Sequence, residues 1–503
     1  MRHRWWAVLV LALGCQGELI DNRFPGIGQP PTPFTPALAF RIGGAGPDLI
    51  TAMVTDPAGG VILAGTFTGS TDFDPGAGVT ALTSLGAIDG FLARYSSSGA
   101  LAWALRFGST GDERVTALAR DASGSLYVGG GFEGAASFGL SGSGVVQNSD
   151  GGEDGFVAKF SPEGVLLWAR RFGGAGLDEV TALAVDGPGN VFAAGVFNGT
   201  ANPFPAGGTN VQSNGASDGF VLSLGPDGSV RWTLPIGGPQ ADGVRGVALS
   251  TTGKVVVAGT FRGAADFDRN GGVATSLRAL GGVDFFLAVY SSTGLLERVR
   301  AVGGLNNESL VVSGLSLDGQ DGAVLLGSFS GSLDFDPGPG LAARTSQSGQ
   351  DVLLARYDAG GEFLSVATVG GLGTVTAARA IVAADGSVVL TGAFSGPIDF
   401  DPGAGINVIT SLGTQGVTDA FAARYTAAGG LAWVGRFGES TAIAGRATSG
   451  TALGFDSAGN PIVVGHFFGS PDFDPGPTAF RLISVGEADG FVVKLTPTGA
   501  LAQ

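Results

Sequence analysis

One tripeptide recurs along almost the whole chain at nearly constant spacing. It first reads Asp89-Gly90-Phe91 and then returns six times with some drift, beginning at Asp154, Asp218, Asp284, Asp351, Asp419 and Asp489. The spacing corresponds to a period of about 67 residues. Self-similarity at a fixed period constrains the fold more strongly than any local pattern does, so the 503 residues predict one repeat domain of seven units and not several unrelated domains.

Each unit has the pattern of a small antiparallel sheet. In the third unit, short apolar runs at 180–185, 191–197, 220–224 and 230–236 are separated by tight turns and one long loop. Glycine supplies 91 residues, and each would oppose a helix by about 1 kcal/mol. Four short strands that are apolar on both faces must stack on neighbouring units. The sequence therefore predicts an all-β, seven-bladed β-propeller with four antiparallel strands per blade.

Other repeat architectures fit the period less well. A β-solenoid usually has shorter repeats, and an immunoglobulin-like sandwich needs about 100 residues per unit. The chain ends favour a closed ring. Residues 38–44 match the end of a fourth strand, as at 168–174, but no first three strands precede them, and the last unit stops at Gln503 where its fourth strand should begin. We predict that the N-terminal strand completes the last blade and leaves no open edge.

Tryptophan occupies one repeated position. Outside the N-terminal segment, all tryptophans fall in the fourth strand of a unit, at Trp103, Trp168, Trp232 and Trp433. Arg298 and Ser365 occupy that position in units four and five. A large amphipathic ring repeated in this way is expected to pack between blades, so we do not interpret these residues as a sugar-binding site.

The N-terminus has the pattern of an export signal. Two arginines precede an apolar stretch of about ten residues, far fewer than the roughly 20 that a spanning helix needs. The sequence Leu11-Ala12-Leu13-Gly14-Cys15 resembles the lipobox of bacterial lipoproteins. That resemblance implies a signal peptide at 1–14, lipidation of Cys15 and, with Gln16 next, sorting to the outer membrane or cell surface. The alternative is an ordinary signal peptide with an incidental cysteine. Residues 15–36 are rich in proline and predict an extended tether.

The repeated motifs are also similar to those of a known family. The unit runs as Thr-Ala-Leu-Ala-x-Asp, Val-x-x-Ala-Gly-x-Phe, Asp-Gly-Phe and Trp-Ala-x-Arg-Phe-Gly, and it resembles the bacterial SBBP β-propeller repeat over about 37–503. The resemblance implies the propeller fold and export. It implies no particular activity and no catalytic residues.

Charge and histidine content narrow the functional classes. The formal net charge of −16 repels phosphate backbones, so we expect no nucleic-acid partner, and contact with a membrane only through lipidated Cys15. The only histidines are His3, in the signal, and His466. Neither a zinc site nor a Ser–His–Asp or Cys–His arrangement can be assembled from them. We therefore expect a monomer without enzymatic activity and without a cofactor, calcium being the one possibility left open.

That possibility comes from the long loops between the second and third strands. Five loops carry Asp-Phe-Asp, and four of these continue with Pro-Gly; units two and three lack it. In an extended chain the two carboxylates point to one side, which suits a hard cation such as calcium. The competing interpretation is turn chemistry, in which each aspartate caps its own backbone. The candidate ligands are Asp72, Asp74, Asp334, Asp336, Asp399, Asp401, Asp472 and Asp474.

Two principal functions are compatible with these features. The favoured one is a lipid-anchored, non-enzymatic module that binds a protein or a glycan through the face carrying the long loops. The alternative is a secreted carbohydrate-active enzyme, a lyase or hydrolase with an acidic site at the central channel. A departure from the repeat such as Asn306-Asn307-Glu308 is where an acidic site would be sought. A purely structural envelope component is the third possibility.

Overall fold

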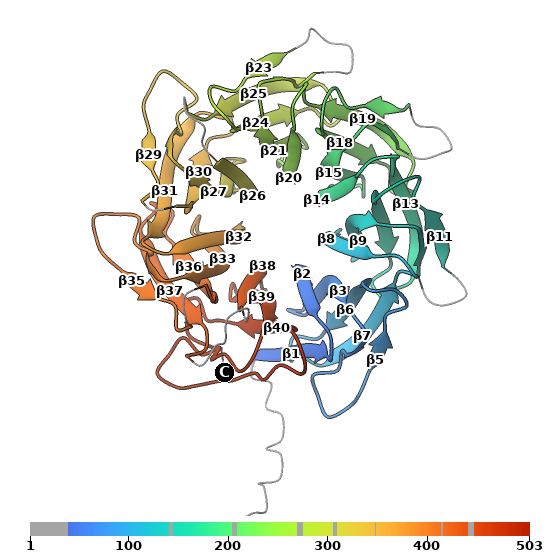
Figure 1. Cartoon of the computed structure of the whole chain (residues 1–503), viewed down its shortest axis with the longest axis vertical. Helices are drawn as coiled ribbons and strands as arrows, with labels where there is room; N and C mark the ends of the chain where they lie inside the picture. Colours follow the sequence, from blue (N-terminus) through green and yellow to red (C-terminus); the bar gives the residue numbers. More distant parts are fainter. Residues whose placement is uncertain are drawn as a thin grey trace, which may run out of the picture. The chain divides into compact units, whose positions relative to one another are not determined.

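The computed structural model describes residues 39–502, apart from 140–143, 204–208, 269–274, 305–308, 348, 414–415 and 441–446. These residues form strands and turns only, and none of them belongs to a helix that could cross a membrane. Seven four-stranded antiparallel sheets stand in a ring around a central channel (Figure 1). The prediction of a seven-bladed β-propeller is confirmed.

Within each blade the strands are named a to d in order from the channel outward, and each strand pairs with the next. The a strands line the channel: β2 (Asp48–Thr55), β8 (Glu113–Arg120), β14 (Glu179–Val185), β20 (Gly243–Leu249), β26 (Ser309–Leu317), β32 (Thr374–Val382) and β38 (Ser449–Phe455). The b strands follow: β3 (Val61–Phe67), β9 (Leu126–Phe132), β15 (Val191–Phe197), β21 (Val255–Phe261), β27 (Ala323–Ser330), β33 (Val388–Ser395) and β39 (Pro461–Phe467).

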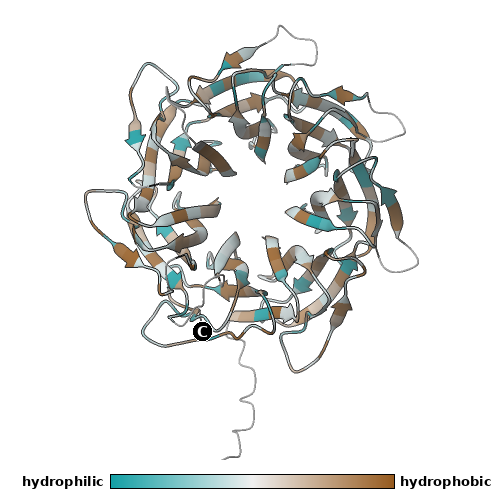
Figure 2. Ribbon diagram, in the orientation of Figure 1, coloured by the Kyte–Doolittle hydropathy of each residue, from teal (hydrophilic) through white to brown (hydrophobic). Residues whose placement is uncertain are grey.

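The c strands begin at the recurring aspartate: β6 (Asp89–Tyr95), β12 (Asp154–Phe160), β18 (Asp218–Leu224), β24 (Asp284–Tyr290), β30 (Asp351–Tyr357), β36 (Asp419–Tyr425) and β40 (Asp489–Lys494). The outer d strands of the first six blades are β7 (Leu101–Phe107), β13 (Leu166–Gly174), β19 (Val230–Ile236), β25 (Leu296–Val302), β31 (Phe363–Gly371) and β37 (Leu431–Phe437). The b and c strands are buried along almost their whole length, and hydrophobic residues run through every blade (Figure 2). Because both faces of each sheet pack on the next blade, the core is shared between blades.

The ring is closed by the N-terminal strand, as predicted. β1 (Ala39–Gly44) is the d strand of the seventh blade and pairs antiparallel with β40, with Phe40 opposite Val492 and Ile42 opposite Gly490. Its Phe40 and Ile42 side chains are buried in the core that the seventh blade shares with the first. Residues from the two ends of the propeller thus form one sheet.

One recurring element was not predicted from the sequence. The b–c connections contain short two-stranded ribbons, β4–β5 (Ser70–Asp72, Ala81–Thr83), β10–β11 (Ala135–Phe138, Val145–Asn148), β16–β17 (Thr200–Asn202, Val211–Gln212), β22–β23 (Ala264–Asp266, Ser276–Arg278), β28–β29 (Ser332–Asp334, Ala343–Thr345) and β34–β35 (Pro397–Asp399, Val408–Thr410). In the seventh blade a single bridge, Asp472 with Arg481, marks the equivalent place. These ribbons lie around the outside of the ring (Figure 1).

The ribbons also join neighbouring blades. The first strand of each ribbon hydrogen-bonds to the end of the d strand of the preceding blade, as β4 does with β1 through Gly43 opposite Asp72. The same contact recurs as β16 with β13 and β34 with β31. A sheet therefore continues outward from one blade into a ribbon that belongs to the next, and the N-terminal strand is held from both sides.

The repeated tryptophans pack between blades, as expected. Trp168 Nε1 donates a hydrogen bond to the backbone oxygen of Pro226, and Trp433 Nε1 donates to that of Pro497, in the c–d turn of the next blade. The ring of Trp433 lies against Gly499, whose φ is +86°, so the turn needs glycine both for its backbone conformation and for the close approach. In blade four Arg298 reaches the equivalent turn at Gly360.

Candidate functional site

The aspartates that begin the c strands are structural. Each is buried, and each accepts a hydrogen bond from a backbone N–H at the end of the preceding b–c connection, as Asp89 does from Leu85 at 3.1 Å and Asp284 from Leu280 at 2.9 Å. Four of them also pair with an arginine of strand d: Asp89 with Arg106 at 2.7 Å, Asp154 with Arg171 at 2.8 Å, Asp489 with Arg41 at 2.8 Å and Asp419 with Arg436 at 3.8 Å. The recurring aspartate therefore fixes the chain where the ribbon returns to the blade.

A second buried acid stands beside this aspartate at four blade junctions. The pairs are Asp48 with Asp489, Glu113 with Asp89, Asp178 with Asp154 and Asp242 with Asp218. Burial first, and the charge of the neighbouring aspartate as a smaller cause, raise the pKa of Asp48 to about 7 and that of Glu113 to about 8. All of these side chains are closed to solvent. They have no access to a substrate, so their role is in the contact between blades.

In the first blade, the Asp-Phe-Asp segment covers the last residue of the ribbon strand β4 and the first two residues of the turn that follows it. Phe73 is fully buried and packs against Phe67 and Phe91, whereas Asp72 and Asp74 on either side of it are partly exposed. This is the alternation expected of an extended chain. Tyr95 donates its hydroxyl hydrogen to the backbone oxygen of Phe73 at 2.9 Å, and burial raises the pKa of this tyrosine well above its usual value.

The carboxylates of these segments accept backbone hydrogen bonds within their own turn. Asp334 Oδ1 accepts from the N–H groups of Asp336 at 3.1 Å and Ala342 at 2.8 Å, and Asp336 Oδ1 accepts from Gly338 at 2.7 Å. The same bonds recur around Asp72 and Asp74, Asp399 and Asp401, and Asp472 and Asp474. These bonds are the turn chemistry that competes with calcium as an explanation of the motif.

The structure brings the candidate calcium ligands together only in twos. Each of the four Asp-Phe-Asp-Pro-Gly segments contributes its own pair of aspartates, and within the described residues no group of three or more acidic, histidine or cysteine side chains could hold a metal ion. One oxygen of each aspartate faces backbone N–H groups, as described for Asp334 and Asp336. Calcium prefers six to eight oxygens, so waters and a second carboxylate oxygen would have to supply the rest. Calcium binding by these pairs stays a prediction.

Exposed aliphatic side chains mark the ribbon tips. Val79, Leu341 and Ile406 follow the Asp-Pro-Gly turn at equivalent positions of three blades, and they are 77%, 81% and 82% exposed. Further exposed aliphatic residues lie where the ribbons return to the c strands, at Leu85, Leu280, Leu412 and Val485. We refer to these seven residues as the apolar rim. Because single exposed aliphatic residues are common, the significance of the rim lies in its repetition at these two positions of the b–c connections in blades one, four, five, six and seven.

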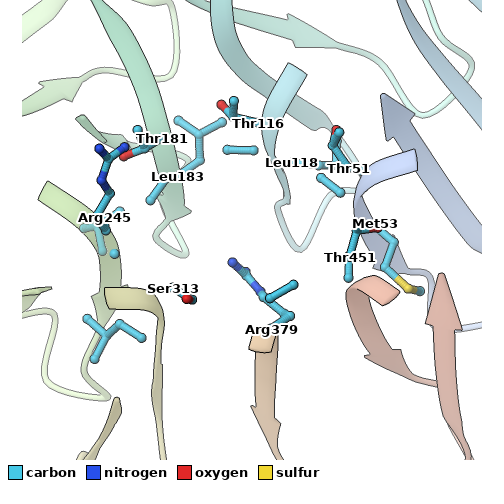
Figure 3. Close-up of a pocket in the computed structure, with 18 residues that line it drawn as sticks. Thr51, Met53, Thr116, Leu118, Thr181, Leu183, Arg245, Ser313, Arg379 and Thr451 are labelled. Atoms are coloured by element: carbon cyan, nitrogen blue, oxygen red, sulfur yellow. The ribbon is translucent and has the colours of Figure 1, made fainter. Parts of the chain in front are cut away.

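The central channel is lined by the a strands (Figure 3). Each a strand has a β-bulge, and the bulged residue is Thr51, Thr116, Thr181, Arg245, Ser313, Ala378 or Thr451. The threonines connect neighbouring blades: Thr51 donates to the backbone oxygen of Val115 at 2.7 Å, Thr181 to that of Val244 at 2.8 Å and Thr451 to that of Ile50 at 2.5 Å. Thr116 makes the same contact with Val180.

Two arginines of this lining were not among the residues singled out from the sequence. Arg245 occupies the bulge position in β20, and Arg379 follows the bulge in β32, where the other a strands have alanine or glycine. Both are departures from the repeated Thr-Ala-Leu-Ala, and this departure is the sequence signal that marks them. The described lining contributes no carboxylate, so the acidic channel site of the alternative function stays a prediction.

The remaining sequence-based candidates are placed as follows. Cys15, His3 and Asn306-Asn307-Glu308 lie outside the described residues. His466 lies in β39 and burial lowers the pKa of its imidazole, so it is held neutral within a strand. It lies where other blades have Thr66 or Thr260, in agreement with a residue that is part of the sheet.

Fold and lining together define a seven-bladed β-propeller with peripheral ribbons and a narrow polar channel. No family model matches the chain. A segment of 103 residues, 20% of the chain, is 34% identical to part of the regulatory protein FlaEY of Caulobacter vibrioides. The matched segment spans 10% of the length of that protein.

Solved structures with a similar arrangement are distant. One is a protein of unknown function from Dyadobacter fermentans, with a TM-score of 0.38 and 14% identity over 76% of this chain and 94% of that one. Another is the β-propeller domain of the Trilobed protease from Pyrococcus furiosus, with a TM-score of 0.37 and 8% identity over 92% of this chain and 99% of that one. A rhamnogalacturonan lyase, YesW, matches with a TM-score of 0.26 and 11% identity over 89% and 90%.

Proposed function

We propose that this chain is an exported, lipid-anchored β-propeller of the SBBP type that acts as a non-enzymatic binding module at the cell envelope. The observation that carries the proposal is the apolar rim, because it repeats large exposed aliphatic residues on ribbons held by a rigid ring. Exposed apolar groups that recur at one level of a molecule are typical of protein-binding surfaces. A protein is therefore the partner class that we favour over a glycan.

The rigidity of the ribbons supports this function. Each ribbon is fixed by β-pairing to the preceding blade, and five of them also by a buried phenylalanine, at Phe73, Phe138, Phe267, Phe335 and Phe400. Four of them are held in addition by a tyrosine hydroxyl. A partner would therefore meet side chains that are already ordered, which lowers the entropic cost of binding. Anchoring through Cys15 would place the propeller next to envelope proteins.

The binding surface is tested by removing the apolar rim without disturbing the core. A triple variant Val79→Ser, Leu341→Ser and Ile406→Ser, made in the full chain, is compared with the control Val165→Ser, Leu295→Ser and Leu364→Ser, which removes exposed aliphatic residues near the c–d turns. In-cell cross-linking followed by mass spectrometry should give specific envelope-protein partners for the wild type and the control, and lose them for the rim variant. Equal cross-linking of all three proteins would contradict the assignment to the rim.

Export and anchoring are tested separately. In the producing cell, the full chain should fractionate with membranes and incorporate a labelled fatty acid, and Cys15→Ser should do neither. A chain that stays soluble and unlabelled in the wild type would refute the lipid anchor while leaving the rim hypothesis intact.

A further inference from the structure

The channel has a nearly sevenfold-symmetric wall against which departures stand out. Five of the seven bulge positions carry a hydroxyl side chain, and the position after each bulge carries alanine or glycine in six blades, at Ala52, Ala117, Ala182, Gly246, Gly314 and Ala452. Small residues at this second position keep the channel open. The wall is polar at the bulges, and it becomes apolar one residue farther on, at Met53, Leu118, Leu183, Val247 and Leu315.

Arginine replaces these small residues on two blades that lie on either side of blade five. Arg245 takes the place of a threonine in β20, and Arg379 takes the place of an alanine or glycine in β32. The side chain of Arg379 extends into the open centre of the channel, Ser313 lies on the adjacent strand β26, and Arg245 lies on β20 beyond it (Figure 3). Two departures from the repeat that line the same cavity indicate that this cavity has a role that the repeated residues do not have.

The two guanidinium groups are poorly compensated. Among the described residues, neither arginine forms an ion pair. Burial raises the pKa of Glu179, and the positive charges of Arg245 and Arg114 partly offset this increase. Arg379 and Arg245 are both exposed side chains of the channel wall, and the described lining of this cavity includes no aspartate or glutamate. Guanidinium groups that are open to a cavity without carboxylates are available to an anion from solution.

We propose that Arg379 and Arg245 form an oxyanion-binding site in the channel, for the carboxylate or phosphate group of a small molecule. Guanidinium presents planar, paired N–H donors that match the oxygens of both groups. The hydroxyl of Ser313 lies between the two arginine-bearing strands and adds a neutral donor. This site is separate from the apolar rim, and it does not depend on the function proposed above.

The dimensions of the cavity limit the ligand. Its volume is about 140 Å³, which corresponds to a few water molecules at roughly 30 Å³ each. Inorganic phosphate or a short carboxylic acid fits this volume, whereas a polymer could enter only by its end. The apolar residues beyond the bulges would contact the carbon chain of an organic acid.

The repeat itself provides substitutions that the fold already tolerates. Arg379→Ala introduces the residue found at that position in four other blades, and Arg245→Thr introduces the residue found in four other blades. Arg278→Ala is the matched control, because it removes an exposed arginine from the ribbon strand β23. The full chain is titrated calorimetrically with inorganic phosphate, with succinate and with neutral glycerol, in a chloride buffer of low ionic strength.

We expect saturable binding of phosphate or succinate, and none of glycerol. Binding should weaken by about 10-fold or more in Arg379→Ala and in Arg245→Thr, since each loses charge-assisted hydrogen bonds, and it should be unchanged in Arg278→Ala. Phosphate binding without succinate binding would identify a phosphate site, and the converse a carboxylate site. Absence of saturable binding for both anions, or equal weakening in the control, would overturn the proposal.

Thermal unfolding supplies an independent readout. If the arginines bind an anion, that anion should raise the melting temperature of the wild type and should not raise that of Arg379→Ala. A purely structural arginine would give a lower melting temperature in Arg379→Ala and no stabilisation of the wild type by the anion.

Discussion

A glycine at the end of each d strand allows the close approach of the aspartate that begins strand c of the same blade. At seven equivalent positions, Gly43, Gly108, Gly173, Gly237, Gly303, Gly370 and Gly438, a Cβ would meet the carboxylate of the aspartate that begins strand c. At Gly173, for example, it would lie 2.6 Å from Asp154 Cγ and 2.9 Å from Asp178 Oδ2. The aspartate of the recurring tripeptide therefore packs directly against the glycine that ends strand d.

Substitution of one such glycine tests this contact. Gly303→Ala should lower the free energy of unfolding by about 1–3 kcal/mol, because its Cβ overlaps Asp284, which is itself held by the Leu280 N–H. The control is Gly319→Ala, in an a–b turn where a Cβ would meet nothing within 4 Å, and its effect should stay within about 0.5 kcal/mol. Chemical unfolding midpoints of both variants provide the measurement. Equal midpoints would contradict the proposed close approach.

The buried acid pairs predict an unusual dependence of stability on pH. The folded pKa of Asp48 is about 7 and that of Glu113 about 8, whereas in an unfolded chain such groups titrate near 4. Between these values the folded chain holds more protons than the unfolded one, so the free energy of unfolding falls as pH rises from about 4 to 8. The melting temperature should therefore be higher at pH 5 than at pH 8.

The variant Glu113→Gln should flatten this dependence, since the amide does not titrate. Exposed Glu487→Gln is the control and should keep the wild-type slope. A melting temperature that rises between pH 5 and pH 8 in the wild type would show that these acids are ionised in the folded chain, which would contradict the protonated state assigned to them.

At the scale of the element, the ribbon shows where sequence-based prediction succeeded and where it could not. The Asp-Pro-Gly turn and the buried phenylalanine were expected from residue type and alternation. The β4 strand is only three residues long, Ser70–Asp72, and part of its pairing is with β1 of the preceding blade. A strand stabilised by a partner about 30 residues away across a blade junction leaves no local signal, because its propensity matters less than tertiary pairing.

The ribbon also distinguishes turn chemistry from calcium binding. In calcium-free buffer containing a chelator, Asp334→Ala should lose about 1–3 kcal/mol, since two backbone N–H groups lose their acceptor, and Asp334→Asn should recover most of it. Melting temperature measured with and without calcium completes the test. A calcium-induced rise in the wild type that Asp336→Asn abolishes would establish the cation site instead.

At the scale of the whole molecule, the repeat predicts the ring because every unit needs a neighbour, and the incomplete end units predict how the ring closes. Positions that obey the repeat were thus accessible from sequence. Arg245 and Arg379 were not identified, because whether a strand residue faces the channel depends on the bulge in its a strand. A departure from the repeat becomes a candidate site only once that orientation is known.

Closure of the ring yields the last prediction. Removal of residues 1–44 deletes β1, whose buried Phe40 and Ile42 side chains each contribute about 1.5–3 kcal/mol through burial. It also leaves one edge of β40 unpaired and removes one of the two strands that pair with β4. This variant should melt well below the wild type and associate with increasing concentration, measured by calorimetry and light scattering. Removal of residues 1–36 is the matched control and should change neither property, because β1 is kept. If a synthetic peptide of residues 37–46 restores the melting temperature of the shorter chain, the loss is due to the missing strand; equal stability of both truncated chains would show that closure contributes nothing.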